Sequence, residues 1–228
     1  MPEAAPKHHE GHRARLKSRF LDAGPQALAD YELLELLLFM AIPRRDVKPL
    51  AKALLARFGD IGAVFAAQPH DMLEVEGMTD GAVVALKAID AAAARIGKAA
   101  VANKPVFSSY ARVLDYCTTV MAREKVEQFR VLYLNRKNML EADEVHQQGT
   151  VDQSAVFPRE IVKRALAHGA TAIILVHNHP SGDPTPSDAD IELTGEIVRA
   201  MDPLGIVVHD HLIIARNGHT SFKKQGLL

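Results

Sequence analysis

The most constraining feature of the sequence is an apolar run, Ala172–Val176, that changes abruptly into His177-Asn178-His179-Pro180. The run is short, rich in β-branched residues and followed by turn-forming residues, which predicts a buried strand. Because residues two apart share one face of a strand, we expect His177 and His179 to point the same way where the strand ends. The stretch therefore predicts a strand that carries two imidazoles at its end.

A loop and a helix start follow the two histidines. Gly182 and Pro184 favour a turn, and Ser187 is a natural helix N-cap with Asp190 three residues later. Taken singly, these residues fit a hydrogen-bonded loop and a capping pair. Together they bring two imidazoles and a carboxylate within reach of one another, and three such ligands with one open position are typical of catalytic zinc.

The spacing of these residues resembles a known motif. His-x-His, ten residues and then Asp, with Pro after the second His and Ser-x-x-Asp at the end, resembles the JAMM (MPN+) metalloprotease motif. The fuller string HNHPSGDPTPS, preceded by PRE and an Ala-rich helix, is similar to the RadC family over about 149–214. The resemblance implies zinc ligation by His177, His179 and Asp190, and an oxyanion-stabilising hydroxyl on Ser187.

A zinc hydrolase also needs a carboxylate that takes a proton from water and later delivers it to the leaving amine. The residues alone leave five candidates open: Glu124, Glu127, Glu141, Glu144 and Glu160. In JAMM proteins the catalytic Glu lies just before a hydrophobic strand, which the resemblance matches to Glu127. The chain departs from the Glu-x-x-Gly context of many JAMM proteases, because Arg130 stands in place of the Gly.

Further polar residues are expected to support the site. Asn178 and Ser181 lie in the motif loop and are expected to orient the ligands. In the strand Gly205–Ala215, alternation places His209 and His211 on one face and Asp210 on the other. The RadC family carries Asp-His at this place, so Asp210 and His211 are expected to be supporting residues.

Composition limits the class of protein. The 228 residues are 48% hydrophobic and 24% charged, as in an ordinary globular protein. The single Cys117 excludes a disulfide framework and a Cys-based zinc site. The sequence shows neither a run long enough for a membrane span nor a signal peptide, so we expect a cytoplasmic protein without membrane association.

The chain is expected to contain two domains. A flexible tail (1–12), a small all-α bundle (13–100) and a linker (101–107) precede a metal-hydrolase domain (108–228). The second domain is expected to be α/β, with an MPN-like (cytidine-deaminase-like) mixed sheet flanked by helices. The expected helices and strands are Asp30–Ala41, Val47–Phe58, His70–Val75, Asp80–Ile96, Ser109–Arg123, Phe129–Asn135, Met139–His146, Pro158–Gly169, Ala172–Val176, Ser187–Leu204 and Gly205–Ala215.

Part of the first domain resembles a DNA-binding element. The turn at Gly77 resembles a helix-hairpin-helix, although Thr79 replaces the second glycine and the acidic Glu74 and Glu76 repel phosphate. A short basic segment contains Arg13, Arg15, Lys17 and Arg19. The net charge of −1 argues against strong DNA binding, so weak association is expected at most.

Two hypotheses follow. The first is a zinc-dependent hydrolase of the JAMM type that cleaves a peptide or isopeptide amide, with zinc as cofactor and Glu127 as general base. The alternative is a DNA repair or recombination factor that binds nucleic acid and uses the MPN domain as an accessory or interaction module. The residues identify neither the protein substrate nor the oligomeric state.

Overall fold

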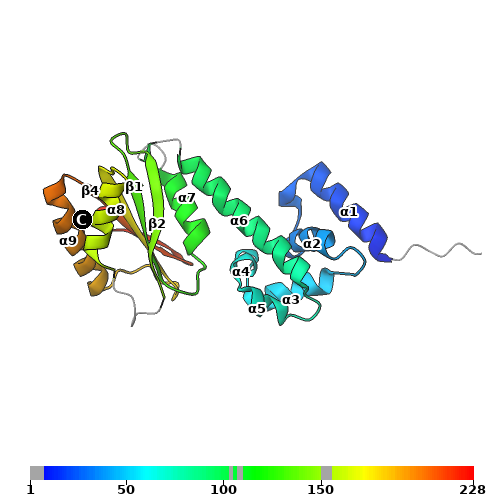
Figure 1. Ribbon diagram of the computed structural model, residues 1–228. Coiled ribbons are helices and arrows are strands. Elements are labelled where there is room, and N and C mark those ends of the chain that lie inside the picture. Colours follow the sequence, from blue (N-terminus) through cyan, green and yellow to red (C-terminus); the bar gives the residue numbers. More distant parts are fainter. Residues whose placement is uncertain (1–7, 103–104, 107–109, 150–155) are drawn as a thin grey trace, which may run out of the picture. The chain divides into compact units, whose positions relative to one another are not determined.

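The computed structural model in Figure 1 describes residues 8–102, 105–106, 110–149 and 156–228. The chain divides into two compact units, Met1–Ala92 and Ala93–Leu228. The division falls inside helix α6 (Asp80–Ala102), before the linker expected at 101–107. The end of α6 belongs to the second unit because Val101 is buried in the same apolar cluster as Cys117.

The first unit is an all-helical bundle, as the apolar stripes predict. Leu34, Leu38, Leu54 and Leu86 form its core and are fully or almost fully buried. Before α6, its elements are α1 (His8–Ala23), η1 (Pro25–Ala27), α2 (Asp30–Ala41), α3 (Lys48–Phe58), α4 (Ile61–Ala66) and α5 (Pro69–Leu73).

Helix α1 begins inside the segment that was expected to be a flexible tail, so the expectation for 8–12 is wrong. The helix is held to the bundle because Leu16 is buried in its core. In addition, Nε2 of His12 lies 3.1 Å from the carboxylate of the fully buried Glu35. These two contacts provide the tertiary support that the sequence pattern of the segment does not reveal.

The second unit is a five-stranded mixed sheet flanked by helices, which confirms the expected fold class. The strand order is β2-β1-β3-β4-β5, with β3 and β4 parallel and the other neighbours antiparallel. Its further elements are α7 (Tyr110–Met121), β1 (Gln128–Leu134), β2 (Leu140–Gln148), α8 (Pro158–Ala167), β3 (Ala172–His179), α9 (Asp188–Met201), η3 (Asp202–Leu204), β4 (Val207–Ala215), β5 (Gly218–Ser221) and α10 (Phe222–Gln225).

Strand β3 is central and covered on both faces. Ile174 and Val176 pack in the cluster that contains residues of α7, whereas Ile173 and Leu175 pack in the cluster that contains residues of α8 and α9. Figure 1 shows the same layers, with α8 and α9 on one face and α7 on the other. The α8–α9 face is the one on which His177 continues the alternation.

Most helix and hairpin boundaries agree with the expected ones to within a few residues, but α6 continues past the expected end at Ile96 to Ala102, and α4 was not expected. Ser187 caps α9 as predicted, and the turn at 216–217 joins β4 to β5. The cap predicted for α7 at Ser108 or Ser109 lies outside the described residues. Within the part of the chain that the structure describes, no helix is long and apolar enough to cross a bilayer.

Candidate metal centre

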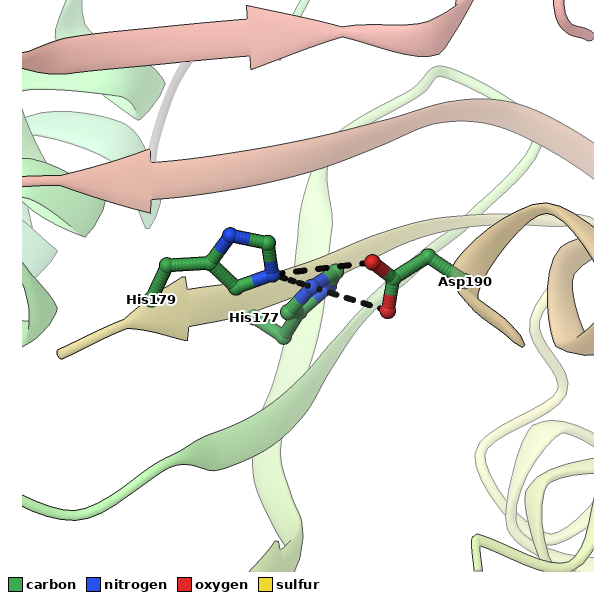
Figure 2. A group of neighbouring side chains, drawn as sticks. All are labelled: His177, His179 and Asp190. Atoms are coloured by element: carbon green, nitrogen blue, oxygen red, sulfur yellow. Dashed lines mark hydrogen bonds and ion pairs between the residues drawn. The ribbon is translucent and has the colours of Figure 1, made fainter. Parts of the chain in front are cut away.

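Three side chains of the predicted motif meet at the end of β3. His177 and His179 project from the strand, and Asp190 projects from the first turn of α9 (Figure 2). Nε2 of His177 lies 2.9 Å from Nε2 of His179 and 3.2 Å from Oδ1 of Asp190, and Nε2 of His179 lies 3.5 Å from Oδ2 of Asp190. The pleat of β3 and the N-cap of α9 therefore bring the predicted ligands together.

The separations suit a tetrahedral zinc ion. Zinc–nitrogen and zinc–oxygen bonds of about 2.0–2.1 Å place neighbouring tetrahedral ligands roughly 3.3 Å apart. The distances among these nitrogen and carboxylate oxygen atoms lie on both sides of that value, and one ligand atom from each residue falls within 4.8 Å of the others. Two imidazoles and one carboxylate are a donor set that zinc accepts, so the residues fit the ion.

The pKa values of Asp190 and His179 are shifted by their contacts within the cluster. Burial raises the pKa of its carboxyl, but the close approach of His177 and His179 outweighs burial and holds the pKa well below its usual range. The hydrogen bond to Asp190 is the largest cause that raises the pKa of His179, and the charge of Glu127 contributes to the same rise. The carboxylate of Asp190 is therefore ionised, and the negative charge of Glu127 acts in the same direction on His179.

His179 is oriented by the motif loop. Its Nδ1 lies 2.8 Å from the carbonyl oxygen of Asp183, and because a carbonyl only accepts, Nδ1–H donates and Nε2 faces the cluster. Ser181 accepts a hydrogen bond from the Asp183 backbone N–H at 3.3 Å. Ser181 thus supports His179 indirectly, through the shape of the loop.

His177 is oriented by two residues behind it. Its Nδ1 lies 2.8 Å from Nε2 of His211, and Nδ1 of His211 lies 2.6 Å from Oγ1 of Thr194 on α9. His211 thus lies directly behind the candidate ligand His177, at the place where the sequence predicts a supporting residue. Thr194 was not predicted, although its position four residues after Asp190 places it on the same face of the helix.

The side-chain hydrogen bonds of Asn178 go to the segment that carries Glu127. The side chain is buried, and its Oδ1 accepts a hydrogen bond from the Gln128 backbone N–H at 2.8 Å. Its Nδ2 donates to the carbonyl oxygen of Val126 at 3.2 Å, with Glu124 O at 3.4 Å. The amide therefore bridges the backbone on both sides of Glu127, which corrects the expected role of Asn178.

Three of the other candidate bases are bonded elsewhere. Glu141 accepts a hydrogen bond from Asn135 at the opposite end of β1. Glu144 pairs with Arg164 and His168, and Glu160 is half-exposed beside Lys163. Glu127 is half-buried and directly precedes β1, next to the strand that ends in the ligands.

Arg130, which replaces the glycine of the JAMM context, points away from the cluster. Phe129 packs on the α8–α9 face, so the next residue faces α7. There Arg130 Nη1 lies 2.6 Å from Oδ1 of the buried Asp143, which also accepts a hydrogen bond from Tyr116. The substitution is therefore accommodated on the other side of the sheet.

Ser187 is closely tied to Asp190. Its Oγ accepts a hydrogen bond from the Asp190 backbone N–H at 3.2 Å and donates to Oδ2 of Asp190 at 2.6 Å. The predicted contribution to an oxyanion site thus requires the hydroxyl to rotate away from the carboxylate. That role stays a prediction, whereas the N-cap is observed.

Asp210 is not beside the ligands, and the expected faces of its strand are wrong. The pairing of β3 with β4 shifts between Ile173 and Ile174, so His209 is bulged. His209 and Asp210 consequently line one cavity on the α7 face. There Asp210 accepts hydrogen bonds from the hydroxyls of Tyr110 and Ser221 and from two backbone N–H groups, which ties β4 to the end of the chain.

Two of the four side chains of the predicted basic segment make contacts within the bundle. Arg13 donates to the backbone carbonyls that follow α2 and lies over the ring of Phe39, and Arg19 pairs with Glu32. The side chains of Arg15 and Lys17 are exposed.

The hairpin-like turn has its own internal contact. The carbonyl of Gly77 accepts a hydrogen bond from Arg45, and Gly77 has a φ of +89°, which favours glycine. DNA binding by this turn or by the basic segment stays a prediction.

A comparison with known families identifies the second unit. A family model described as RadC-like JAB domain matches residues 107–227, which includes the whole sheet, the three candidate ligands and Glu127. The match covers more than half of the chain.

Proposed function

The chain belongs to the RadC-like JAB domain family, and on that premise we propose that it is a zinc-dependent hydrolase that cleaves a peptide or isopeptide amide bond. The observation that carries the proposal is the cluster of two imidazole nitrogens and one carboxylate at tetrahedral separations. Three protein ligands leave one coordination position for a reactant, as in catalytic zinc sites.

Each residue has a distinct part in the proposed reaction. His177, His179 and Asp190 hold the zinc ion, which when bound lowers the pKa of water and polarises a carbonyl. Glu127 takes the proton from the attacking water and returns it to the leaving amine. Asn178 keeps Glu127 in place through the backbone on either side of it.

The experiment is a hydrolysis assay on the zinc-loaded full-length protein. Its substrates are internally quenched peptides and isopeptides joined through a lysine side chain. We expect cleavage of at least one class by the wild type, and none by Glu127→Gln, which keeps its zinc because Glu127 is not a ligand. The half-exposed Glu160 provides a matched control, so Glu160→Gln is expected to retain activity.

Two outcomes contradict the proposal. Cleavage by Glu127→Gln at the wild-type rate would remove Glu127 from the reaction. Failure of the zinc-loaded wild type to cleave either class would remove amide hydrolysis as the function.

A further inference from the structure

We propose that Thr194 acts through His211 to hold His177 in the tautomer whose Nε2 lone pair faces the candidate metal site. The inference rests on the metal site of the proposed function, and it extends that site to a positioning residue on α9. His179 needs no such help, because a backbone carbonyl accepts its Nδ1–H directly. His177 has another imidazole as its neighbour, and an imidazole nitrogen either donates or accepts.

A backbone carbonyl at one end determines which way the protons point along the hydrogen-bond chain. Oγ1 of Thr194 lies 2.5 Å from the carbonyl oxygen of Asp190, which has no proton to give. The threonine hydroxyl therefore donates its single proton to Asp190. Such a bond from a helical threonine to the carbonyl four residues earlier is a common local contact.

The next two links follow from the first. With its proton directed at Asp190, Thr194 accepts from Nδ1–H of His211 at 2.6 Å. Neutral His211 then presents a lone pair on Nε2, which accepts Nδ1–H of His177 at 2.8 Å. The remaining nitrogen of His177, Nε2, carries the lone pair that a metal ion requires.

The side chains of this hydrogen-bond chain are shielded from water, which could otherwise donate or accept hydrogen bonds in their place. Thr194 and His211 are 2% and 0% exposed. The ring of Phe129 stacks on His177 with an interplanar angle of 12°, and the ring of Phe222 lies 4.5 Å from that of His211.

The hydrogen-bond chain also links two candidate ligands that come from different elements. Thr194 is bonded to the backbone of Asp190 at the start of α9, while His211 on β4 contacts His177 on β3. The same three hydrogen bonds therefore set the tautomer of His177 and tie the first turn of α9 to the sheet.

The opposite direction is the competing arrangement. If Thr194 donated to His211, His211 would donate to His177, and Nε2 of His177 would carry a proton toward Asp190. Nitrogen-15 NMR of the imidazoles in the metal-free full-length protein distinguishes the two arrangements. We expect Nδ1–H on His177 and His211 in the wild type, and Nε2–H on His177 would overturn the proposal.

Two variants test the role of the hydroxyl. Thr194→Ser keeps it and is expected to retain the wild-type tautomer and zinc affinity within about threefold. Thr194→Val removes it, and we expect a mixture of His177 tautomers and zinc binding weakened about 10–100-fold, as for other residues that orient metal ligands. Thermal unfolding of both variants shows whether the fold is retained.

The readouts separate this proposal from the proposed function. The tautomer is measured without metal or substrate, so it can be confirmed in a protein that proves inactive. A wild-type tautomer and wild-type zinc affinity in Thr194→Val would overturn the positioning role, whatever the hydrolytic activity.

Discussion

Substitution of Asn178 by alanine tests how Glu127, the proposed base, is held in place. The substitution removes the side-chain hydrogen bonds to the backbone of Gln128, Val126 and Glu124. A typical hydrogen bond contributes about 1 kcal/mol, and each buried partner left unpaired costs about 1–3 kcal/mol. We therefore expect Asn178→Ala to lower the free energy of unfolding by about 2–4 kcal/mol, as measured by denaturant titration.

A local readout distinguishes loss of the clamp from general destabilisation. The Gln128 amide donates to Asn178, so its hydrogen exchange is expected to accelerate more in the variant than that of core amides in β3. Asn135 provides the control, because its side chain similarly accepts from the backbone of Lys137 and Met139, but at the other end of β1. Asn135→Ala is expected to leave Gln128 exchange unchanged relative to those core amides.

Zinc binding completes the test of Asn178. Because the hydrogen bonds of its side chain go to the backbone around Glu127, and the candidate ligands keep their own side chains, we expect Asn178→Ala to bind zinc within about threefold of the wild type. A loss of unfolding free energy below about 0.5 kcal/mol, with unchanged exchange at Gln128, would refute the reasoning.

Two further predictions concern groups outside the cluster. Asp210→Ala removes four hydrogen bonds on the α7 face, so it is expected to cost about 3–5 kcal/mol of unfolding free energy while the folded protein still binds zinc; an unchanged denaturation midpoint would contradict this. Hydrogen bonding from Arg164, opposed by burial and assisted by His168, lowers the pKa of Glu144 from 4.5 to about 2. The stability from this carboxylate is present above pH 4.5 and is lost as the pH falls toward 2, so Glu144→Gln is expected to weaken the acid dependence of unfolding in that window, and an identical profile would contradict the prediction.

The three candidate ligands are predictable from the sequence because they lie in one contiguous strand, loop and helix start. The apolar run requires a buried strand, its pleat aligns His177 with His179, and the Ser187 cap determines where Asp190 begins the helix. Each step depends on local preferences, which a short sequence window contains.

The supporting residues are less predictable, because their positions depend on tertiary pairing. A bulge at His209 reverses the alternation that would place Asp210 opposite His209, and it results from how β4 pairs with β3. Thr194 lies on a helix face that reads as ordinary core, and only its contact with His211 reveals its role. Similarly, the exposure of Arg13 depends on its hydrogen bond to the backbone that follows α2, which lies far along the sequence.

The measurement that tests the central claim most directly is the zinc content per chain, by elemental analysis of the reconstituted full-length protein. We expect about one zinc ion in the wild type and in the control His8→Ala/His9→Ala, whose histidines lie outside the motif. His177→Ala/His179→Ala is expected to bind none. Absence of zinc from the wild type, or an unchanged content in His177→Ala/His179→Ala, would contradict the account.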